Sequence, residues 1–417
     1  MRILWYTNTP CLYKQNNAYN GGGWLSSLER EIIKHKEVKL GIAFSLDDET
    51  EKITENGVIY YPLRINKHSL WKKVKACFCS TDKLINDERK RYSYYEKEIK
   101  KPINDFKPDI IIVFGSEMPF GLVAGVTKIP VILHIQGILN PYMNAYLPPF
   151  ISWDKYKTMN TGLIDKINKR IDRKMWQVSC EREMEICKRV KNYFGRTDWD
   201  FRVCQMMHPG ANYIYSSEVL RPLFYQPSVR KLPSKLTIVT TISSPLYKGY
   251  DLVLKTAKLL SDKGLDFEWN CYGNIAPTVV ERQLGIFHEK LNVQLCGVAS
   301  AEQLREAICH STVYVHTSYI DNSPNSLCEA QILGCTPIAT YVGGVPSLIK
   351  DGVTGYLVPA NDPYQLAFLL EDVFCHPDIN IRIGQVAKKV ANERHNPITI
   401  VDKLLNDLNT IICYHQK

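Results

Sequence analysis

The stretch HTSYIDNSPNSLCEAQILGCTPIA, which spans His316–Ala339, carries the pattern that decides the fold. Val313–His316 is typical of a buried strand, Ser323 is suited to cap a helix, and Pro324 suits the first helical position. Pro337–Ala339 is the next short apolar strand. A strand, a helix and a second strand in this order predict a βαβ unit of a parallel sheet.

The same alternation continues on both sides of this stretch, so an α/β fold is expected throughout. Further strands are predicted at Leu236–Thr240, Phe267–Tyr272 and Val293–Cys296, and in the first half at Met1–Tyr6, Leu40–Phe44, Asp109–Phe114 and Val131–Ile135. Helical patterns separate them, including a helix from about Trp24, the charged stretch Asp87–Lys101, Tyr250–Leu260 and Ala301–Cys309.

The length of 417 residues favours two or three domains. Leu223–Lys235 contains prolines and little periodicity, which predicts a boundary between a first domain of residues 1–222 and a second of residues 223–396. The last segment, residues 397–417, contains a helix at Ile398–Ile412. We expect that helix to cross back and pack on the first domain through the apolar positions Ile400, Leu404, Leu408 and Ile411.

Composition indicates a globular protein of the cytoplasm. Hydrophobic residues make up 45% of the chain, and the formal net charge of +9 favours anionic partners. The 13 scattered cysteines suggest reduced thiols, the amino terminus lacks the pattern of a signal peptide, and no apolar run reaches the ~18 residues of a membrane span. Nucleic-acid binding is disfavoured because no basic and aromatic recognition module is present.

A helix that begins after Val313–His316 presents free backbone amides at the carboxyl end of a parallel strand. The amides of Asn325, Ser326 and Leu327 would form an anion site there. Asp321 and Glu329 bracket that site, and two carboxylates suit the hydroxyls of a sugar nucleotide. The alternative is a capped helix with an exposed Asp and a salt-bridged Glu.

Two other segments could approach a phosphate. Lys248 and Gly249 follow a predicted strand and precede a helix, which favours a diphosphate, although a solvent-exposed lysine is the alternative. The run Asn20–Gly23 precedes the first long helix, and its glycines permit close approach of the backbone to a ligand. It is not a GxGxxG fingerprint, so a nicotinamide dehydrogenase is disfavoured.

Some patterns are discounted as functional signals. The string Asp198-Trp199-Asp200 could hold a divalent cation but is too short to be specific, and no histidine spacing supports a metal centre. Lys166–Lys174 predicts a basic helix with apolar residues on one side. That helix is either a solvated surface or a contact with an anionic membrane, through Ile167, Ile171 and Met175.

In combination, the segments Lys248–Leu260 (KGYDLVLKTAKLL) and Cys296–Pro359 are far more specific than their parts. Over residues 236–375 the chain resembles the donor domain of retaining glycosyltransferases of family 4. The string GRTDWD around Arg196 resembles bacterial polysaccharide-type members. This resemblance implies the GT-B fold, with two Rossmann-like domains facing a cleft. It also implies a nucleotide diphosphate sugar as donor and no metal or other cofactor.

The resemblance also implies roles for individual residues. Glu329 matches the second acid of the family's E-x7-E motif, which binds the ribose. Asp321 matches the first acid, which contacts the transferred sugar, and is one methylene shorter than the usual Glu. Lys248 matches the lysine on the diphosphate. The Arg that the family usually has a few residues before this lysine is missing, since Ile242–Ser244 occupies that place.

In the first half, Gly22 and Gly23 match the glycine loop that approaches donor phosphate and acceptor. The family commonly has a strand ending in His where this chain has Gln136, and His134 lies two residues earlier on the same strand face. We expect either residue to act in the cleft. The turn Gly343–Pro346 matches a framework element behind the site.

The prediction from sequence is a metal-independent, retaining glycosyltransferase. It would move a sugar from a nucleotide diphosphate sugar to a hydroxyl of a glycan or lipid-linked acceptor, in the synthesis of a cell-surface polysaccharide such as a capsule. The expected location is the cytoplasm, with peripheral contact to the inner face of the membrane. Two alternatives stay open: a degenerate, non-catalytic protein that binds sugar nucleotides or glycans, and a sugar-nucleotide epimerase of similar fold.

Overall fold

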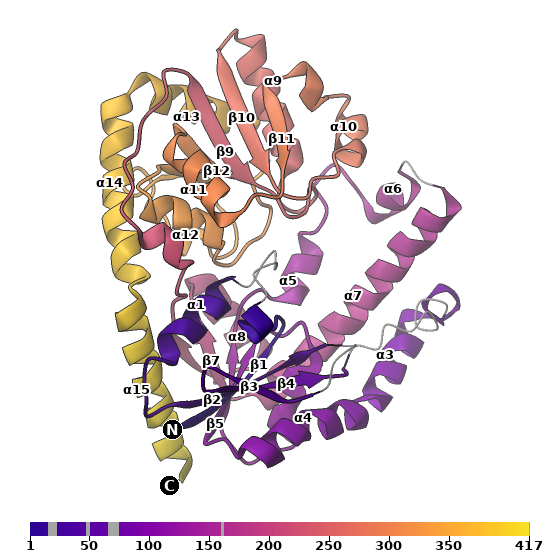
Figure 1. The fold of residues 1–417 in the computed structure, drawn as a ribbon. Helices are drawn as coiled ribbons and strands as arrows, with labels where there is room; N and C mark the ends of the chain where they lie inside the picture. Colours follow the sequence, from indigo (N-terminus) through magenta and orange to yellow (C-terminus); the bar gives the residue numbers. More distant parts are fainter. Residues whose placement is uncertain (16–22, 47–50, 66–74, 160–161, 417) are drawn as a thin grey trace. The chain divides into compact units, whose positions relative to one another are not determined.

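The computed structural model describes residues 1–15, 23–46, 51–65, 75–159 and 162–416, which form two compact units (Figure 1). The first unit comprises residues 1–143, 161–219 and 396–417, and the second comprises residues 144–160 and 220–395. Each unit contains one sheet, and the two are described separately below.

An eight-stranded sheet forms the first unit, in the order β3-β4-β2-β1-β5-β6-β7-β8. All neighbours are parallel except β3 and β4, which pair antiparallel. The strands are β1 (Arg2–Thr7), β2 (Lys39–Ser45), β3 (Ile53–Glu55), β4 (Val58–Leu63), β5 (Ile110–Phe114), β6 (Val131–His134), β7 (Asn192–Gly195) and β8 (Asn212–Tyr215).

Helices cover both faces of this sheet because its strands are apolar on both sides. In β1, Ile3 and Trp5 face one core while Leu4 and Tyr6 face the other. The first core is closed by α1 (Gly23–Ile32) and α15 (Pro397–Gln416), and the second by α4 (Tyr92–Phe106), the 3₁₀ helix η2 (Pro119–Gly125) and α7 (Leu163–Arg189). The unit also contains η1 (Tyr13–Gln15), α3 (Thr81–Lys90), α5 (Leu139–Asn144) and α8 (Asp198–Met207).

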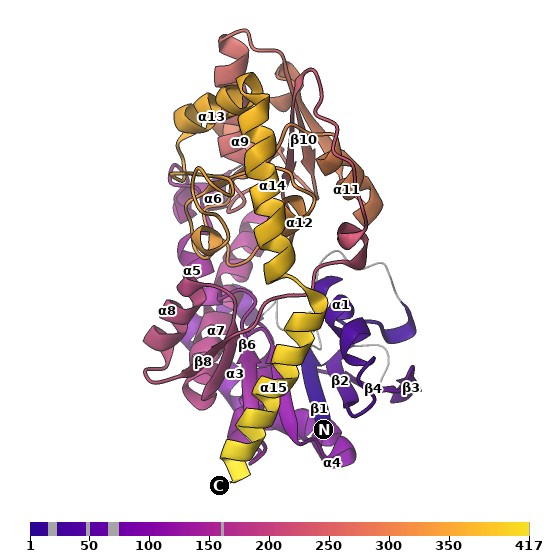
Figure 2. The ribbon, with the colours of Figure 1, turned by 90° about the vertical axis from the view of Figure 1, so that its left-hand side faces the viewer.

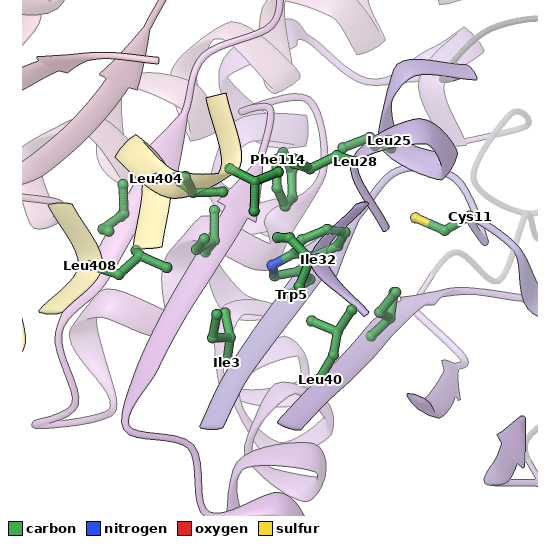
Figure 3. Close-up of a cluster of buried hydrophobic side chains, with 14 of the residues drawn as sticks. Ile3, Trp5, Cys11, Leu25, Leu28, Ile32, Leu40, Phe114, Leu404 and Leu408 are labelled. Carbon is green, nitrogen blue, oxygen red and sulfur yellow. The ribbon is translucent and has the colours of Figure 1, made fainter. Parts of the chain in front are cut away.

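The last helix packs on the first unit, as the sequence predicted. Figure 2 shows α15 running along the sheet of that unit beside α1. Leu404 and Leu408 insert among Ile3, Trp5 and Phe114 of the central strands (Figure 3). The apolar face of α15 is therefore part of the core of the first unit.

Six parallel strands form the sheet of the second unit, in the order β11-β10-β9-β12-β13-β14. They are β9 (Leu236–Thr241), β10 (Phe267–Tyr272), β11 (Val293–Gly297), β12 (Val313–His316), β13 (Pro337–Thr340) and β14 (Tyr356–Val358). The chain winds outwards from β9 in one direction and then from β12 in the other. The strand order therefore reverses between β9 and β12, which is the position where open α/β sheets bind ligands.

Helices lie on both faces of the second sheet. One face carries α9 (Tyr250–Asp262) and α13 (Pro363–Cys375), and the other carries α11 (Ala301–Cys309), α12 (Asn325–Ile332) and α14 (Pro377–Arg394). The remaining elements of the unit are α6 (Trp153–Thr158), η3 (Pro222–Tyr225), α10 (Thr278–Leu284), η4 (His288–Lys290) and η5 (Val345–Ser347).

The segment of residues 144–160 departs from the expected domain division. It was assigned to the first domain, but it packs on the second unit, where Ile151 is buried in the core formed by α9 and α13. The remaining boundaries lie at residues 219/220 and 395/396, close to the expected 222/223 and 396/397.

Sequence patterning missed the short strands β3, β4, β7, β8 and β14, and it merged α3 and α4, which meet at Arg91, into one charged helix. Among the helices of the described ranges, none is both long enough and apolar enough to cross a bilayer.

Candidate active site

The candidate donor site lies at the carboxyl ends of β9 and β12, the two adjacent strands at which the strand order reverses (Figure 1). Lys248 is in the loop after β9, and Asp321 is in the loop after β12. The side chains meet, and Lys248 Nζ donates to Asp321 Oδ2 in a largely buried ion pair. The structure thus brings together two residues that are 73 apart in the chain.

Both partners of this ion pair are charged at neutral pH. Burial alone would raise the pKa of the Asp321 carboxyl, but Lys248 and His316 outweigh it and hold that pKa well below its usual range. Burial would lower the pKa of the Lys248 ammonium, but Asp321 raises it above its usual value. The pair therefore presents a fixed cation and a fixed anion at one sheet edge.

Two glycines allow the loops of the site to approach each other. Gly249 has φ +71°, and a Cβ there would lie 2.0 Å from the carbonyl oxygen of Thr317. Gly343 has φ +49°, and a Cβ would lie 1.9 Å from the carbonyl oxygen of Asp321. The next amide, of Gly344, donates to that same oxygen at 2.9 Å. The turn that starts at Gly343 therefore fixes the backbone of Asp321.

The amino end of α12 faces the same edge of the sheet, with small departures from expectation. The helix begins at Asn325 with Pro324 as its N-cap, whereas Ser323 was expected to cap it. The amide of Leu327 was predicted to be free, but it donates to the Pro324 carbonyl at 3.0 Å. The end has no side-chain cap, and the amides of Asn325 and Ser326 lie in its first turn. These are the groups that can meet an anion.

Glu329 lies inside α12, is 2% exposed, and is paired with a residue that sequence patterning did not identify. Arg221 Nε and Nη2 each donate to one carboxylate oxygen at 2.7 Å. Burial raises the pKa of Glu329, and Arg221 offsets only part of that shift. The salt-bridged glutamate that the sequence left as an alternative is therefore present in the structure.

In the first unit, His134 is enclosed by aromatic rings. Its centroid lies 5.2 Å from those of Trp24 and Phe114, and 5.9 Å from that of Phe194. The side chain is 1% exposed, and burial, followed by the charge of Arg196, lowers its pKa to about 3. A neutral histidine in an aromatic core does not reach a substrate, so the catalytic role expected as an option for His134 is withdrawn.

Gln136, the other option, lies beyond the end of β6 and is half-buried. Its backbone carbonyl oxygen accepts a hydrogen bond from Arg196 Nη2 at 3.1 Å. The guanidinium of Arg196 also lies 5.5 Å from the ring centroid of Trp24, the second residue of α1. Arg196 thus ties the loop after β6 to the first turn of α1. Gly23 is the first residue of α1, whereas Gly22 lies outside the described residues.

The DxD string has a structural role. Thr197 accepts from the Asp200 amide at 3.2 Å, and the Asp200 carboxylate accepts from the amides of Arg196 and Thr197, which forms a capping box on α8. Asp200 is fully buried and also accepts from the Tyr213 hydroxyl. This acid is therefore committed to the start of α8.

The basic helix lies in the first half of α7, and most of its apolar side is already used. Ile171 is 5% exposed, and it packs together with Met175 in a small core that includes residues of α3. Lys174 Nζ donates to the carbonyl oxygens of Ala76 and Cys79. Of the predicted apolar face, Ile171 and Met175 are thus internal, whereas Ile167 is 38% exposed, and the first turn exposes Leu163 and Ile164 at 75% and 76%.

Comparison with known proteins assigns a class to the second unit. Residues 233–374 match the family model "Glycosyl transferases group 1". A D-inositol 3-phosphate glycosyltransferase of Streptomyces avermitilis is 36% identical over 206 residues, which cover 45% of this chain and 42% of that protein. A putative colanic acid biosynthesis glycosyltransferase of Salmonella typhimurium is 24% identical over 200 residues, covering 45% and 48%. The chain spans less than half the length of these relatives.

Solved structures resemble the chain over nearly its whole length. Sucrose-phosphate synthase from Thermosynechococcus elongatus has a TM-score of 0.72 at 12% identity, covering 99% of each chain. HepE of Anabaena, in complex with UDP and glucose, has a TM-score of 0.64 at 12% identity, covering 98% of this chain and 99% of the other. The chain therefore has the GT-B fold that the family resemblance implied, and residues 233–374 of its second unit match the group 1 glycosyl transferase model.

Proposed function

We propose that this protein is a glycosyltransferase that moves a sugar from a nucleotide diphosphate sugar to a hydroxyl of a glycan or lipid-linked acceptor. The observation that carries the proposal is the Lys248–Asp321 pair, which comes from loops after β9 and β12 and flanks the reversal of strand order. A cation, a helix amino terminus and a fixed carboxylate at this position suit a diphosphate joined to a sugar.

Each group has a role in the proposed donor complex. Lys248 and the first-turn amides of α12, at Asn325 and Ser326, stabilise the charge of the departing diphosphate. Asp321 orients the transferred sugar, and Glu329 binds the ribose. Gln136 serves the acceptor side. The names of the solved and curated relatives support this choice of ligand, since one was solved with UDP and glucose and others are glycosyltransferases.

The proposed reaction retains the configuration of the donor sugar and uses no metal. The bond between the anomeric carbon and the diphosphate oxygen breaks as the acceptor oxygen bonds to the same carbon on the same face. The acceptor proton passes to the departing diphosphate, so no protein nucleophile is needed. The described residues contribute by orienting the sugar and by holding positive charge beside the leaving group.

The proposed setting is the synthesis of a cell-surface polysaccharide, such as a capsule, on the cytoplasmic face of a membrane. One curated relative is a putative glycosyltransferase of colanic acid biosynthesis, which supports this setting. Leu163 and Ile164 at the start of α7 are the apolar residues that would reach an anionic bilayer, next to Lys166 and Arg170.

A non-catalytic sugar-nucleotide-binding protein is the second candidate. It is favoured by one observation, which is that both acids of the site already have cationic partners: Lys248 on Asp321 and Arg221 on Glu329. A sugar-nucleotide epimerase is a third outcome, and it would act on the donor without an acceptor.

A thermal-shift screen with nucleoside diphosphates, followed by a transfer assay, tests the proposal. A ligand at a hundred times its Kd stabilises the protein by ~2.7 kcal/mol. Transfer that keeps the anomeric configuration, read by NMR, with activity unaffected by chelator, is the expected result. Binding without transfer or hydrolysis indicates the binding protein, and conversion of the donor alone indicates the epimerase. No stabilisation by any nucleoside diphosphate contradicts all three.

A further inference from the structure

A buried histidine lies beside the candidate catalytic carboxylate. His316 is the last residue of β12, and its side chain is 2% exposed. Its Nε2 atom lies 3.1 Å from Asp321 Oδ2 but makes no hydrogen bond there, so the ring is near the carboxylate and still has an unused donor. Neither the sequence pattern nor the family resemblance gives this residue a role, because it stands at the end of a strand that reads as an ordinary apolar element.

The contacts of Asp321 are divided between its two oxygens. Oδ2 accepts from Lys248 Nζ, faces His316 Nε2, and lies 3.5 Å from Ser318 Oγ. Oδ1 accepts from the backbone amide of Asn322 at 3.2 Å. The two basic groups therefore lie beside the same oxygen. If one of them moves away, the other remains next to that oxygen as a possible hydrogen-bond donor.

The three side chains carry one positive and one negative charge. Burial lowers the pKa of His316, and the contact with Asp321 offsets only part of that shift, so the imidazole is neutral at neutral pH. A neutral imidazole can donate one N–H to a carboxylate. His316 can thus serve as a hydrogen-bond donor to Asp321 without adding a charge that would compete with Lys248.

Binding of a diphosphate places opposing demands on Lys248. To reach a phosphate oxygen, the ammonium must loosen its contact with Asp321. A buried carboxylate that loses its partner is costly by several kcal/mol, which would oppose the binding. A second donor beside the same oxygen removes that opposition, because His316 Nε2, which has no hydrogen-bond partner among the described residues, can donate to the carboxylate once the lysine turns.

We propose that His316 is a positioning residue that holds Asp321 in place while Lys248 turns to the diphosphate of the donor, which rests on the proposed binding of a nucleoside diphosphate at this site. His316 does not touch the substrate. It acts through Asp321, so that the lysine can serve the leaving group and the carboxylate keeps the orientation needed for the sugar.

The test compares H316Q with H316M. Glutamine offers an N–H at nearly the same reach as Nε2, whereas methionine fills similar space without a donor. The measured quantities are the dissociation constants of UDP and UMP by calorimetry, and the melting temperature of each variant. UMP is the internal control because it lacks the second phosphate that draws Lys248.

We expect wild type and H316Q to prefer UDP over UMP, and H316M to lose this preference by about tenfold with little change in UMP affinity. In a D321A background, H316M should have no further effect, because the carboxylate that needs the donor is gone. If H316M is too unstable to purify, H316L takes its place in each comparison, because leucine also lacks a donor.

An unchanged UDP preference in H316M, or a loss of equal size in H316Q and H316M at equal melting temperature, overturns the role of His316. So does an undiminished effect in the D321A background. Failure of the wild-type protein to bind UDP or any other nucleoside diphosphate is a different result, because it removes the proposed function itself.

Discussion

Arg221 binds Glu329 through Nε and Nη2 of its guanidinium, each at 2.7 Å from one carboxylate oxygen. The acid that the sequence places at a ribose is therefore already ion-paired within the second unit. A planar guanidinium that matches a carboxylate in this way fixes the rotamer of the acid, so Glu329 is oriented before any nucleotide arrives.

Replacing either partner separates the two roles of Glu329. If Glu329 also binds ribose, E329A should abolish measurable UDP binding, whereas R221A should weaken it only modestly. R221A should lose stability, by roughly 1–3 kcal/mol, because it leaves the buried Glu329 unpaired, and E329A should lose less because Arg221 is 30% exposed. Calorimetric titration with UDP and chemical denaturation of both variants make the comparison. Equal UDP affinity in E329A and wild type would leave Glu329 as a structural residue only.

Asp321 should affect turnover more than nucleotide binding. D321A removes the group that is proposed to orient the sugar, so kcat should fall by ~10²-fold. The affinity for nucleoside diphosphate should stay at or somewhat above the wild-type value, since Lys248 loses an internal competitor. D321E is the control, because it restores the carboxylate with one more methylene. Transfer by D321A at the wild-type rate would contradict the assignment.

His134 should make the protein sensitive to acid. Its folded pKa is lowered to about 3 from 6.5, so between these values the unfolded chain binds a proton that the folded chain does not. Stability is thus lost progressively as the pH falls below about 6.5, by about 2 kcal/mol between pH 7 and pH 5. H134F removes this group and should flatten the pH dependence by that amount in urea denaturation. Identical slopes for both proteins would contradict the prediction.

Leu408 should anchor α15 to the first unit. It is fully buried, so L408A should lower the free energy of unfolding of that unit by ~2–5 kcal/mol. Ile398, on the same helix, is 70% exposed, and I398A should stay within about 0.5 kcal/mol of wild type. Denaturant titration of the full chain measures both. Similar losses in the two variants would show that the helix is held by something other than its buried face.

Membrane association should depend on the first turn of α7. We expect sedimentation with phosphatidylglycerol vesicles at low salt and release at high salt, since each Lys or Arg near such a surface contributes ~1 kcal/mol. The double variant L163S/I164S should bind more weakly, because it removes two largely exposed apolar side chains. Binding that is absent, or indifferent to salt, would remove the membrane from the proposed setting.

The central strands of the second sheet were predictable because they are largely buried and read as apolar runs. Leu236–Thr241 and Val313–His316 show this clearly, and the helix patterns between strands fix the parallel order. By contrast, Asn192–Gly195 and Tyr356–Val358 are short and lack such a run, so periodicity could not identify them. Val313–His316 is as short as Asn192–Gly195 and was still predicted, so the lack of a clear apolar run, and not strand length, limited the prediction of the fold.

The predicted site residues were found by motif, and their partners were not. Lys248, Asp321 and Glu329 stand in recognisable local patterns. Arg221 lies 108 residues from Glu329 in the chain, and no local signal links them. His316 could have been noticed as a polar residue ending a buried strand five positions before Asp321. Side-chain pairing across loops is a property of the sheet topology, which spacing alone does not encode.

The inserted segment of residues 144–160 determines which parts of this protein can be exchanged. The chain leaves the first unit after residue 143 and returns to it at residue 161. It enters the second unit again at residue 220, and α15 belongs to the first unit. A hybrid that joins two relatives at a single point near residue 220 would combine the second unit of one relative with the 144–160 segment of the other. That segment would then be foreign to the core in which Ile151 packs. Recombination between such proteins is therefore expected to succeed at paired junctions around residues 143 and 160, and to fail at a single crossover near residue 220.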